Sequence, residues 1–514
     1  MADATKDGGV PNRTLITVCA MAATLMQALD GTIANVALPY MQGGLSATAD
    51  QVTWVLTSYI VAAAIMTSPV GAFAARHGRK RIFLISVAGF TAASLLCGAA
   101  QSLEQMVLFR VLQGAFGAAL VPLSQATMLD IYPPAKRGSA MAVWGMGVML
   151  GPILGPTLGG WLTEYYNWRW VFYVNLPVGV LAFAGLSIFL HEDRPAQARS
   201  FDWFGFGVFS LGIGALQLML DRGQREDWFQ STEILIETGV AVLGLWLFLV
   251  HLFTAKRPFI PPRIFRDRNF LSGLMMMFVV GVILFSTSAL LAPYLQTLGG
   301  YPVFDAGLLM APRGVGTMMA MMVAGRLADR VDPRALMLFG VCVIGWTLWD
   351  MTTWTPDLDR HHLMLVTAGQ GFGLGFIFIP LQVIAFATLS PDLRTDGTAL
   401  TSLVRNIGSA IGISVTIAVL EHDSQVLHAE IGSLVTPLNR MLGLPGVAQH
   451  WDPATAGGAA LLNAEITRQA QVMAYANDFY LLFLLCVPTA LLVMMMRRPG
   501  GHRPAADPAH VAMD

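Results

Sequence analysis

An acidic and a basic side chain stand inside long stretches that otherwise carry no charge. Asp30 lies within residues 14–39 and Arg110 within residues 105–129. We place both near the same end of their segments. A charge inside a hydrocarbon layer is costly unless it is paired or hydrated. This placement predicts either a buried pair whose carboxylate takes up and releases a proton, or a fixed ion pair that joins two helices.

Two further arginines lie in uncharged stretches, Arg313 within 306–328 and Arg405 within 398–420. We expect both to pack against helix carbonyl groups, and Arg405 is also a candidate for the wall of a substrate cavity. The other candidates for that wall are placed only by their position along a predicted span: Gln27, Asn35, Gln125, Tyr294, Phe378 and Gln382. The four cysteines are widely spaced without a CxxC pair, so we expect neither a metal site nor a disulfide framework.

Glycine recurs at every fourth position of one apolar segment, with prolines between. A stripe of this period places small residues on one face of a helix and lets a neighbouring helix approach closely. Each proline removes a backbone hydrogen bond and makes the helix bendable. The residues are Gly147, Gly151, Pro152, Gly155, Pro156 and Gly159.

A basic, glycine-containing motif follows the second apolar segment and is partly repeated after the tenth. The first copy runs from Gly71 to Arg81 and includes Arg76, Gly78 and Arg79. The second contains Gly325, Asp329 and Arg330. Such an internal repeat is typical of a transporter built from two related halves, and we expect both copies to gate its cytoplasmic side.

The motifs of several enzyme classes are missing from the sequence. Neither HExxH nor GxSxG occurs, and none of the four lysines follows a glycine as the nucleotide-binding motif GxxxxGK[ST] requires. The sequence therefore indicates neither a membrane hydrolase nor a pump with its own nucleotide site. Transport would be driven by an ion gradient or run downhill, without a cofactor. The net charge of −1 argues against a nucleic-acid partner.

Composition places all these residues in a polytopic membrane protein. The chain has 514 residues, of which 55% are hydrophobic and 12% charged, against about 25% charged in soluble domains, and its mean hydropathy is +0.59. A helix needs about 20 apolar residues to cross a bilayer. Fourteen segments qualify: 14–39, 52–75, 82–101, 105–129, 139–162, 171–190, 203–220, 233–254, 270–293, 306–328, 335–353, 362–388, 398–420 and 478–496.

The distribution of Lys and Arg over the connections sets the predicted orientation. Most of the 31 basic residues fall on one side when the N-terminus is placed in the cytoplasm, which predicts both termini inside. We divide the chain into a six-span half at 1–190, a linker with two inserted spans at 191–269, a second half at 270–496 and a polar cytoplasmic tail at 497–514. The second half contains a long external segment at 421–477, with a Gly/Pro-rich middle between two stretches that could be amphipathic helices.

Taken together, these motifs resemble the major facilitator superfamily over essentially the whole chain. Gly71–Arg81 looks like its loop 2–3 motif, Leu108–Gly114 like its fourth-helix motif and Gly147–Gly160 like its antiporter motif. Leu29–Pro39 resembles the first-helix motif of the fourteen-span drug:proton antiporters, with Asp30 as its acidic position. The loop motif departs from the family because Ala75 stands where an acidic residue is usual, which puts the salt-bridge latch of the first half in doubt.

Within that branch the EmrB/QacA type fits, and the EmrB-like group fits best. Four segments carry this closer resemblance: Pro122–Gln125, Tyr132–Arg137, Leu218–Gly223 and Asp227–Phe229.

The resemblance implies an all-helical fold of two six-helix bundles plus two extra helices, rocking about a central cavity. It implies proton-driven export of hydrophobic or amphipathic drugs across the inner membrane of a Gram-negative bacterium, with Asp30 accepting the proton and Arg110 tuning it. It also implies a membrane-fusion adaptor like EmrA and an outer-membrane channel like TolC, for which 421–477 is either a docking surface or only a cap over the cavity. A dedicated exporter of one metabolite, siderophore or fatty acid is the alternative. A membrane sensor would need a signalling domain that the sequence does not indicate.

Overall fold

The structure is a computed structural model of the chain. It describes residues 12–133, 136–191, 201–256, 258–328, 330–435, 451 and 455–496. Within these helices, the side chains of a few residues fall outside the description: Val36, Ala49, Asp50, Pro152, Ile153, Pro156, Thr157, Val303 and Phe304. Every regular element of the described ranges is a helix, which confirms the predicted all-helical class.

The N-terminal half spans ten helical elements. They are α1 (Arg13–Gly44), α2 (Ala49–Val52), α3 (Trp54–Thr67), α4 (Val70–His77), α5 (Arg79–Ala99), α6 (Leu103–Gly117), α7 (Leu120–Ile131), α8 (Arg137–Tyr165), α9 (Trp170–Tyr173) and α10 (Asn175–Phe189). The predicted span 52–75 is the pair α3 and α4, which meet at 54°. Pro69 lies at this bend, directly before α4, where its ring disfavours a continuous helix.

The inserted pair and the C-terminal half follow. The inserted helices are α11 (Trp203–Arg222) and α12 (Thr232–Thr254), with the short turns η2 (Trp228–Gln230) and η3 (Pro262–Arg266). The C-terminal half contains α13 (Arg268–Pro293), η4 (Tyr294–Leu298), α14 (Val303–Leu327), α15 (Pro333–Met351), α16 (Arg360–Ala387), η5 (Pro391–Leu393), α17 (Arg394–Ser433) and α19 (Ala456–Met495).

Twelve helices among the described residues are long and apolar enough to cross a membrane, or thirteen if the bent pair counts as one span. Helix α8 is not among them, although it runs without a break over the predicted span 139–162. The predicted total of fourteen spans stays a prediction.

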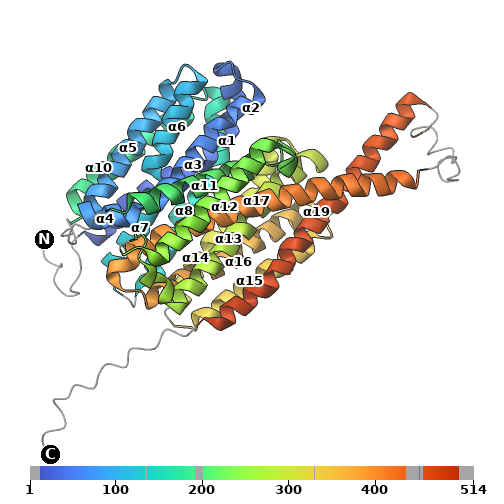
Figure 1. The fold of residues 1–514 in the computed structure, drawn as a ribbon. Coiled ribbons are helices and arrows are strands. Elements are labelled where there is room, and N and C mark those ends of the chain that lie inside the picture. Colours follow the sequence, from blue (N-terminus) through green and yellow to red (C-terminus); the bar gives the residue numbers. More distant parts are fainter. Residues whose placement is uncertain are drawn as a thin grey trace, which may run out of the picture.

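The two halves have matching internal packing. Helix α1 packs on α8 and α3 on α6 in the first half, as α13 packs on α17 and α14 on α16 in the second. Contacts between α8 and α14 and between α7 and α17 join the halves. Figure 1 shows the blue-to-cyan half and the yellow-to-red half side by side, with the green inserted helices across them.

The inserted helix α11 touches both halves. It packs on α3 and on α17 as well as on its partner α12. Thr57 of α3 donates a hydrogen bond to the Asp221 carboxylate near the end of α11. On the other side, the Ser414 hydroxyl of α17 donates to the Leu220 carbonyl at 3.2 Å. The insertion therefore lies against the line along which the two halves meet.

Helices α17 and α19 project beyond the other helices and form what we call the arm (Figure 1). Each is 40 residues long, and each continues without a break from a predicted span into the predicted external segment. The amphipathic stretches expected at 421–477 are therefore extensions of the spans rather than separate helices, because no proline or glycine pair interrupts 421–431 or 459–477. The Gly/Pro-rich middle of this segment lies almost wholly outside the described residues.

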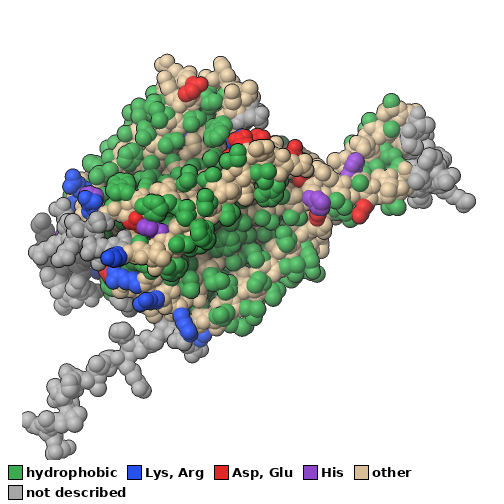
Figure 2. Space-filling model, in the orientation of Figure 1, with side chains coloured by type: hydrophobic (Ala, Val, Ile, Leu, Met, Phe, Trp, Pro, Cys, Tyr) green, Lys and Arg blue, Asp and Glu red, His purple; other side chains and the backbone are tan. Residues whose placement is uncertain are grey.

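The surface divides into an apolar body and two polar ends. Hydrophobic side chains cover the body, whereas Lys and Arg gather at the end where α1 begins and α19 ends (Figure 2). We call this the basic end, and the opposite end, from which α17 and α19 project, the arm end. Large apolar side chains such as Leu181, Phe253 and Met495 are more than two-thirds exposed, as expected for a surface in contact with lipid.

Candidate functional site

Asp30 and Arg110 form a direct ion pair at the centre of the N-terminal half. The Arg110 Nη1 donates to Asp30 Oδ2 at 2.7 Å, and both side chains are 0% exposed. Asp30 Oδ1 accepts two more hydrogen bonds, from Gln113 Nε2 at 2.8 Å and from Asn175 Nδ2 at 3.2 Å. The carboxylate on α1 is thus held by side chains of α6 and α10.

The guanidinium of Arg110 is also held on several sides. Its Nε donates to the Val55 carbonyl at 2.9 Å and its Nη1 to Gln113 Oε1 at 2.8 Å. It lies over the Tyr59 ring at 4.2 Å, an arrangement that favours a cation. Helix α6 can come this close to α3 because Gly114 has no side chain. A Cβ at this position would collide with the Tyr59 carbonyl oxygen.

This arrangement suits a carboxylate that exchanges partners. A proton that binds Asp30 Oδ2 must displace Arg110, so the proton and the guanidinium compete for one oxygen. Gln113 and Asn175 can remain bonded to the other oxygen throughout. The pairing predicted from the depth of Asp30 and Arg110 is confirmed. Gln113 was missed although it lies one helical turn after Arg110, and for Asn175 the sequence offers no signal.

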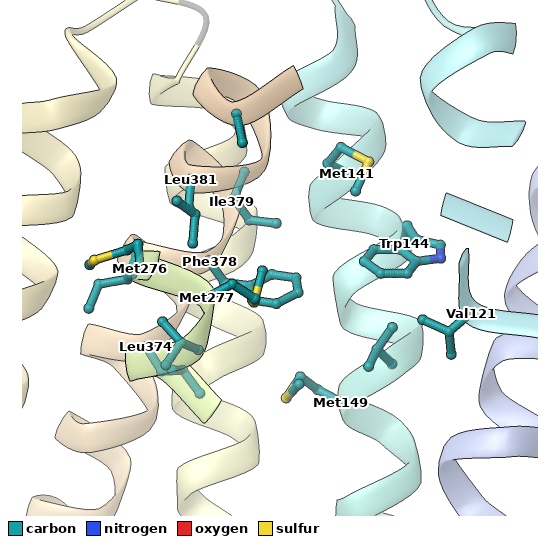
Figure 3. Close-up of a cluster of buried hydrophobic side chains, with 14 of the residues drawn as sticks. Val121, Met141, Trp144, Met149, Met276, Met277, Leu374, Phe378, Ile379 and Leu381 are labelled. Carbon is teal, nitrogen blue, oxygen red and sulfur yellow. The ribbon is translucent and has the colours of Figure 1, made fainter. Parts of the chain in front are cut away.

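Three of the predicted cavity residues lie between the two halves, in contact with side chains of the opposite half. Gln125 Nε2 on α7 donates to Gln382 Oε1 on α16 at 2.6 Å, and both side chains are buried. Phe378 stacks on Trp144 of α8, with 6.3 Å between ring centroids. Figure 3 shows Trp144 and Phe378 from opposite halves facing each other among methionine and leucine side chains. These side chains therefore join the two halves where α7 and α8 face α16.

The other cavity candidates are not brought to that cluster. Gln27 is half-buried and Asn35 exposed, both on α1. Tyr294 is buried at the arm end of the C-terminal half, against Trp354, Tyr475 and Phe479. Arg405 is half-buried on α17, and its Nε has no hydrogen-bond partner among the described residues.

The glycine stripe of α8 packs on α1, the helix that carries Asp30. A Cβ at Gly151 would lie 2.6 Å from the Ala28 carbonyl carbon, and one at Gly155 would collide with the Thr32 hydroxyl. That hydroxyl lies 3.2 Å from the Gly151 carbonyl oxygen. Gly147 and Gly159 meet side chains of the same helix, which confirms the predicted close approach. The side chains of Pro152 and Pro156 lie outside the described residues.

The first basic motif takes part in a contact that joins the halves at the basic end. Arg79 pairs with Asp130 at the end of α7, and Arg394 Nη1 of α17 pairs with the other Asp130 oxygen at 2.5 Å. One carboxylate therefore binds an arginine from each half. A side chain at Gly71 would collide with Asp396, in the first turn of α17. An acidic residue of the opposite half thus lies beside the motif in which Ala75 replaces the usual acid.

The remaining motif residues differ in their contacts. A Cβ at Gly325 would lie 2.5 Å from the Ala142 Cβ, so the second copy also packs against the opposite half. Gly78 has a φ of 89°, a conformation that L side chains rarely adopt, at the point where α5 begins. Arg76 and Arg330 are exposed, and Asp329 lies outside the described residues. Sequence reasoning missed Asp130, Arg394 and Asp396, which single-sequence motifs do not relate to one another.

Known proteins resemble this chain over most of its length. The family model described as the Major Facilitator Superfamily matches residues 20–413. The multidrug export protein EmrB of Escherichia coli (strain K12) is 36% identical over 427 residues, 83% of each chain. The fatty acid resistance protein FarB of Neisseria gonorrhoeae is 33% identical over 93% of this chain and 96% of its own.

A solved structure carries the same fold. The human organic anion transporter MFSD10 (TETRAN) superposes with a TM-score of 0.57 over 93% of this chain and 100% of its own, at 15% identity. This likeness concerns the fold alone. The family match and the full-length relatives show that the chain is a multi-pass membrane protein belonging to the Major Facilitator Superfamily, a transporter family rather than an enzyme family.

Proposed function

We propose that this protein is a proton-driven antiporter that exports hydrophobic or amphipathic compounds by alternating access. The observation that carries the proposal is the buried network around Asp30, in which a proton and Arg110 compete for Oδ2. The relative EmrB, which matches most of the chain, is named as a multidrug export protein. An apolar, methionine-rich interior suits varied lipophilic substrates because methionine side chains repack easily (Figure 3).

The packing offers a route from the proton site to the interface between the halves. Asp30 lies on α1, which is locked onto α8 through Gly151 and Gly155. Helix α8 in turn packs on α14 of the other half. A shift of α1 on protonation would therefore move α8 against α14. One proton entering down 100 mV supplies about 2.3 kcal/mol, enough for about a 50-fold substrate gradient.

The basic end is, in this proposal, the cytoplasmic side of the bacterial inner membrane, with both chain termini there. The support is the collection of Lys and Arg at that end. The contacts of Asp130 with Arg79 and Arg394 then close the transporter to the cytoplasm. Opening inward would require Asp130 to release Arg394 while it keeps Arg79, its partner in the same half.

We also propose that the protein is the inner-membrane part of a tripartite pump, with an adaptor like EmrA and an outer-membrane channel like TolC. The support is the arm, which projects from the predicted external end and so offers an adaptor a surface well away from the body (Figure 1). Exposed apolar side chains on the arm include Val426, Leu434 and Leu461.

A dedicated exporter of one compound is the second candidate. Its support is FarB, which is named as a fatty acid resistance protein and matches nearly the whole chain. A fatty acid is amphipathic, because it joins one charged group to a long apolar chain. An apolar cavity could therefore bind either fatty acids or lipophilic drugs. The substrate panel therefore decides between a broad and a narrow exporter.

The test uses proteoliposomes with an imposed pH gradient and a panel containing a lipophilic cation, an uncoupler that is a weak acid, and a long-chain fatty acid. We expect gradient-driven flux in the wild type and none above empty liposomes in Asp30→Asn, with substrate binding retained. Asp350→Asn is the matched control, because Asp350 is a partly exposed carboxylate that pairs with His362 away from this network. Equal flux in wild type and Asp30→Asn would remove Asp30 from the coupling.

A further inference from the structure

A second carboxyl group is fully buried in the C-terminal half, and none of the residues that the structure describes donates a hydrogen bond to it. Asp478 lies on the face of α19 that packs into the bundle, in line with Ala470, Ala474 and Leu482. Its side chain is 0% exposed, and neither carboxylate oxygen has a hydrogen-bond partner among the described residues. Asp30, buried to the same extent, receives three hydrogen bonds from charged and amide donors.

The neighbours of Asp478 supply no positive charge. On its own helix Tyr475 lies one turn away, and on α17 the acidic Asp423 faces it. Tyr475 and Phe479 stack against Tyr294 of η4 and against Trp354 beyond the end of α15. On the α15 side, Asp350 is bonded to Trp354 Nε1 and His362. No described Lys, Arg or His forms an ion pair with Asp478.

The backbone beside this carboxyl is also unusual. Residues Tyr294–Leu298 form a π-helical turn at the end of α13, and such turns are rare and frequently occur at functional sites. The buried hydroxyl of Tyr294 has no partner among the described residues, like the Asp478 oxygens. Polar atoms without partners and a π-helical turn therefore coincide where α13, α17 and α19 meet.

An ionised carboxylate in such a place would be strongly unfavourable, because burial without hydrogen bonds or a counter-ion removes all solvation of the charge. A protonated carboxyl is neutral and costs far less. The negative charge of Asp423 nearby acts in the same direction. We propose that Asp478 is a second proton-binding site of this transporter, occupied in the conformation described here and reached from the arm end.

Two short connections lead from Asp478 towards the surface at the arm end. Asn477, the next residue along α19, donates to the half-buried Asp423 at 2.9 Å. Tyr475 approaches the exposed Thr297 on the π-helical turn. The proton moves from water at the arm end onto a carboxylate oxygen of Asp478 and returns to the same side. Loss of the proton would leave a buried charge and force α19 apart from α13 and α17.

The inference rests on the proposed function in taking the arm end as the external side, so that external alkalinity would empty this site. Proton binding itself can be measured without transport. We would follow the infrared carbonyl band of buried carboxylic acids in the purified full-length protein in lipid nanodiscs, from mildly acidic to alkaline pH. Wild type, Asp478→Asn, Asp30→Asn and Glu430→Gln would be compared, the last as a control because Glu430 is an exposed carboxylate on the neighbouring helix α17.

We expect a band that is present in wild type, in Asp30→Asn and in Glu430→Gln, and lost in Asp478→Asn. Asparagine has the shape of the neutral acid, so this variant is expected to fold. A spectrum of Asp478→Asn identical to that of wild type would overturn the proposal. If the band is lost in Asp478→Asn and gradient-driven flux is retained in Asp30→Asn, the proton site at Asp478 stands and the proposed coupling at Asp30 is rejected.

A second measurement does not depend on spectroscopy. A group that is neutral in the folded protein and ionised in the unfolded chain makes stability fall as pH rises. Thermal unfolding of wild type should therefore become easier at alkaline pH, and Asp478→Leu, which completes the apolar face of α19, should lose part of that dependence. An unchanged pH dependence in a folded Asp478→Leu protein would count against the proposal.

Discussion

The two halves share their packing but treat buried charge in opposite ways. In the N-terminal half the Asp30 carboxylate and the Arg110 guanidinium neutralise each other, and the amide groups of Gln113 and Asn175 also bind the carboxylate. In the C-terminal half Arg313 reaches only the Ser288 hydroxyl at 2.7 Å and the Leu284 carbonyl at 2.9 Å, as expected for packing against helix carbonyls. No described acidic residue pairs with it.

This difference indicates which half can respond to protonation of a carboxylate by changing the ion-pair partner of that carboxylate. In the first half protonation breaks an existing ion pair and frees a cation inside the protein. In the second, Asp478 forms no ion pair with any described residue, so gain or loss of its proton would change only the cost of its own burial. If both proposals hold, the same fold contains a carboxylate that exchanges partners in one half and a carboxyl group that only binds and releases a proton in the other.

The largest effect should come from removing one member of the complete pair. Arg110→Leu leaves the Asp30 carboxylate buried without its counter-ion, which typically costs about 3–5 kcal/mol. We expect a steep loss of folded protein, measured by size-exclusion chromatography and thermal unfolding. The double variant Asp30→Asn, Arg110→Leu should recover a large part of the loss.

Arg313→Leu sharpens the comparison because it removes a cation that pairs with no acidic residue in the described ranges. We expect its stability to stay within about 1 kcal/mol of wild type. A destabilisation as large as that of Arg110→Leu would mean that the C-terminal cation is also held by a carboxylate, and the contrast between the halves would disappear.

A smaller effect is expected where α1 and α8 touch. The new methyl group of Gly151→Ala would lie 2.6 Å from the Ala28 backbone, so a helix must shift, at about 1–3 kcal/mol. We expect gradient-driven flux to be lower in Gly151→Ala than in wild type. Gly160→Ala is the control on the same helix, because nothing lies within 4 Å of the added carbon. Equal flux in both variants would contradict a role for the α1–α8 contact.

The hydrogen bond between Gln125 and Gln382 should give an effect of about the same or smaller size. Gln125→Leu leaves the Gln382 amide buried without its partner, which costs about 1–3 kcal/mol. The double variant with leucine at both positions should be nearly neutral. A double-mutant cycle in thermal unfolding measures this coupling across the halves, and a coupling near zero would show that the bond contributes little to closure.

The smallest effect belongs to the contact at the basic end. Arg394→Gln removes the only described ion pair of Asp130 that crosses between the halves, worth up to about 1 kcal/mol at a partly exposed site. The population open at the basic end should rise several-fold, as read by thiol labelling of a cysteine introduced at Ala142. Arg263→Gln is the control, since its pair with Asp392 links the inserted segment to the C-terminal half and does not join the two halves. Unchanged labelling would show that Arg394 does not help to close this end.

The sequence was sufficient for the class of fold and for the main pair. An apolar chain of repeated spans predicts a helical membrane protein, and the similar depth of Asp30 and Arg110 predicted their contact. Asn175 was not predictable, because an asparagine at the start of a span gives no sign of what it faces. Asp478 was missed because it stands at the predicted boundary of the last span, where a polar residue is ordinary.

Two further points depend on features that a single sequence does not contain. The contact of Gln125 with Gln382 depends on which conformation the transporter adopts, and a sequence encodes every conformation of the cycle. The length of the last helices was underestimated because hydropathy marks where lipid begins, whereas backbone hydrogen bonds continue until a helix breaker intervenes.

The 40-residue length of α17 and α19 has a mechanical consequence. A helix of that length measures about 60 Å, twice the roughly 30 Å of the hydrocarbon layer, so about half of each can stand clear of the bilayer. Both belong to the C-terminal half and are tied together there, by His428 and Asn463 at 3.1 Å among other contacts. Rigid-body rotations of about 15° occur in proteins. Such a rotation of the C-terminal half would move the far end of the arm by about 8 Å. A molecule outside the membrane that binds the far ends of α17 and α19 could then distinguish the states of the transport cycle by the position of these ends.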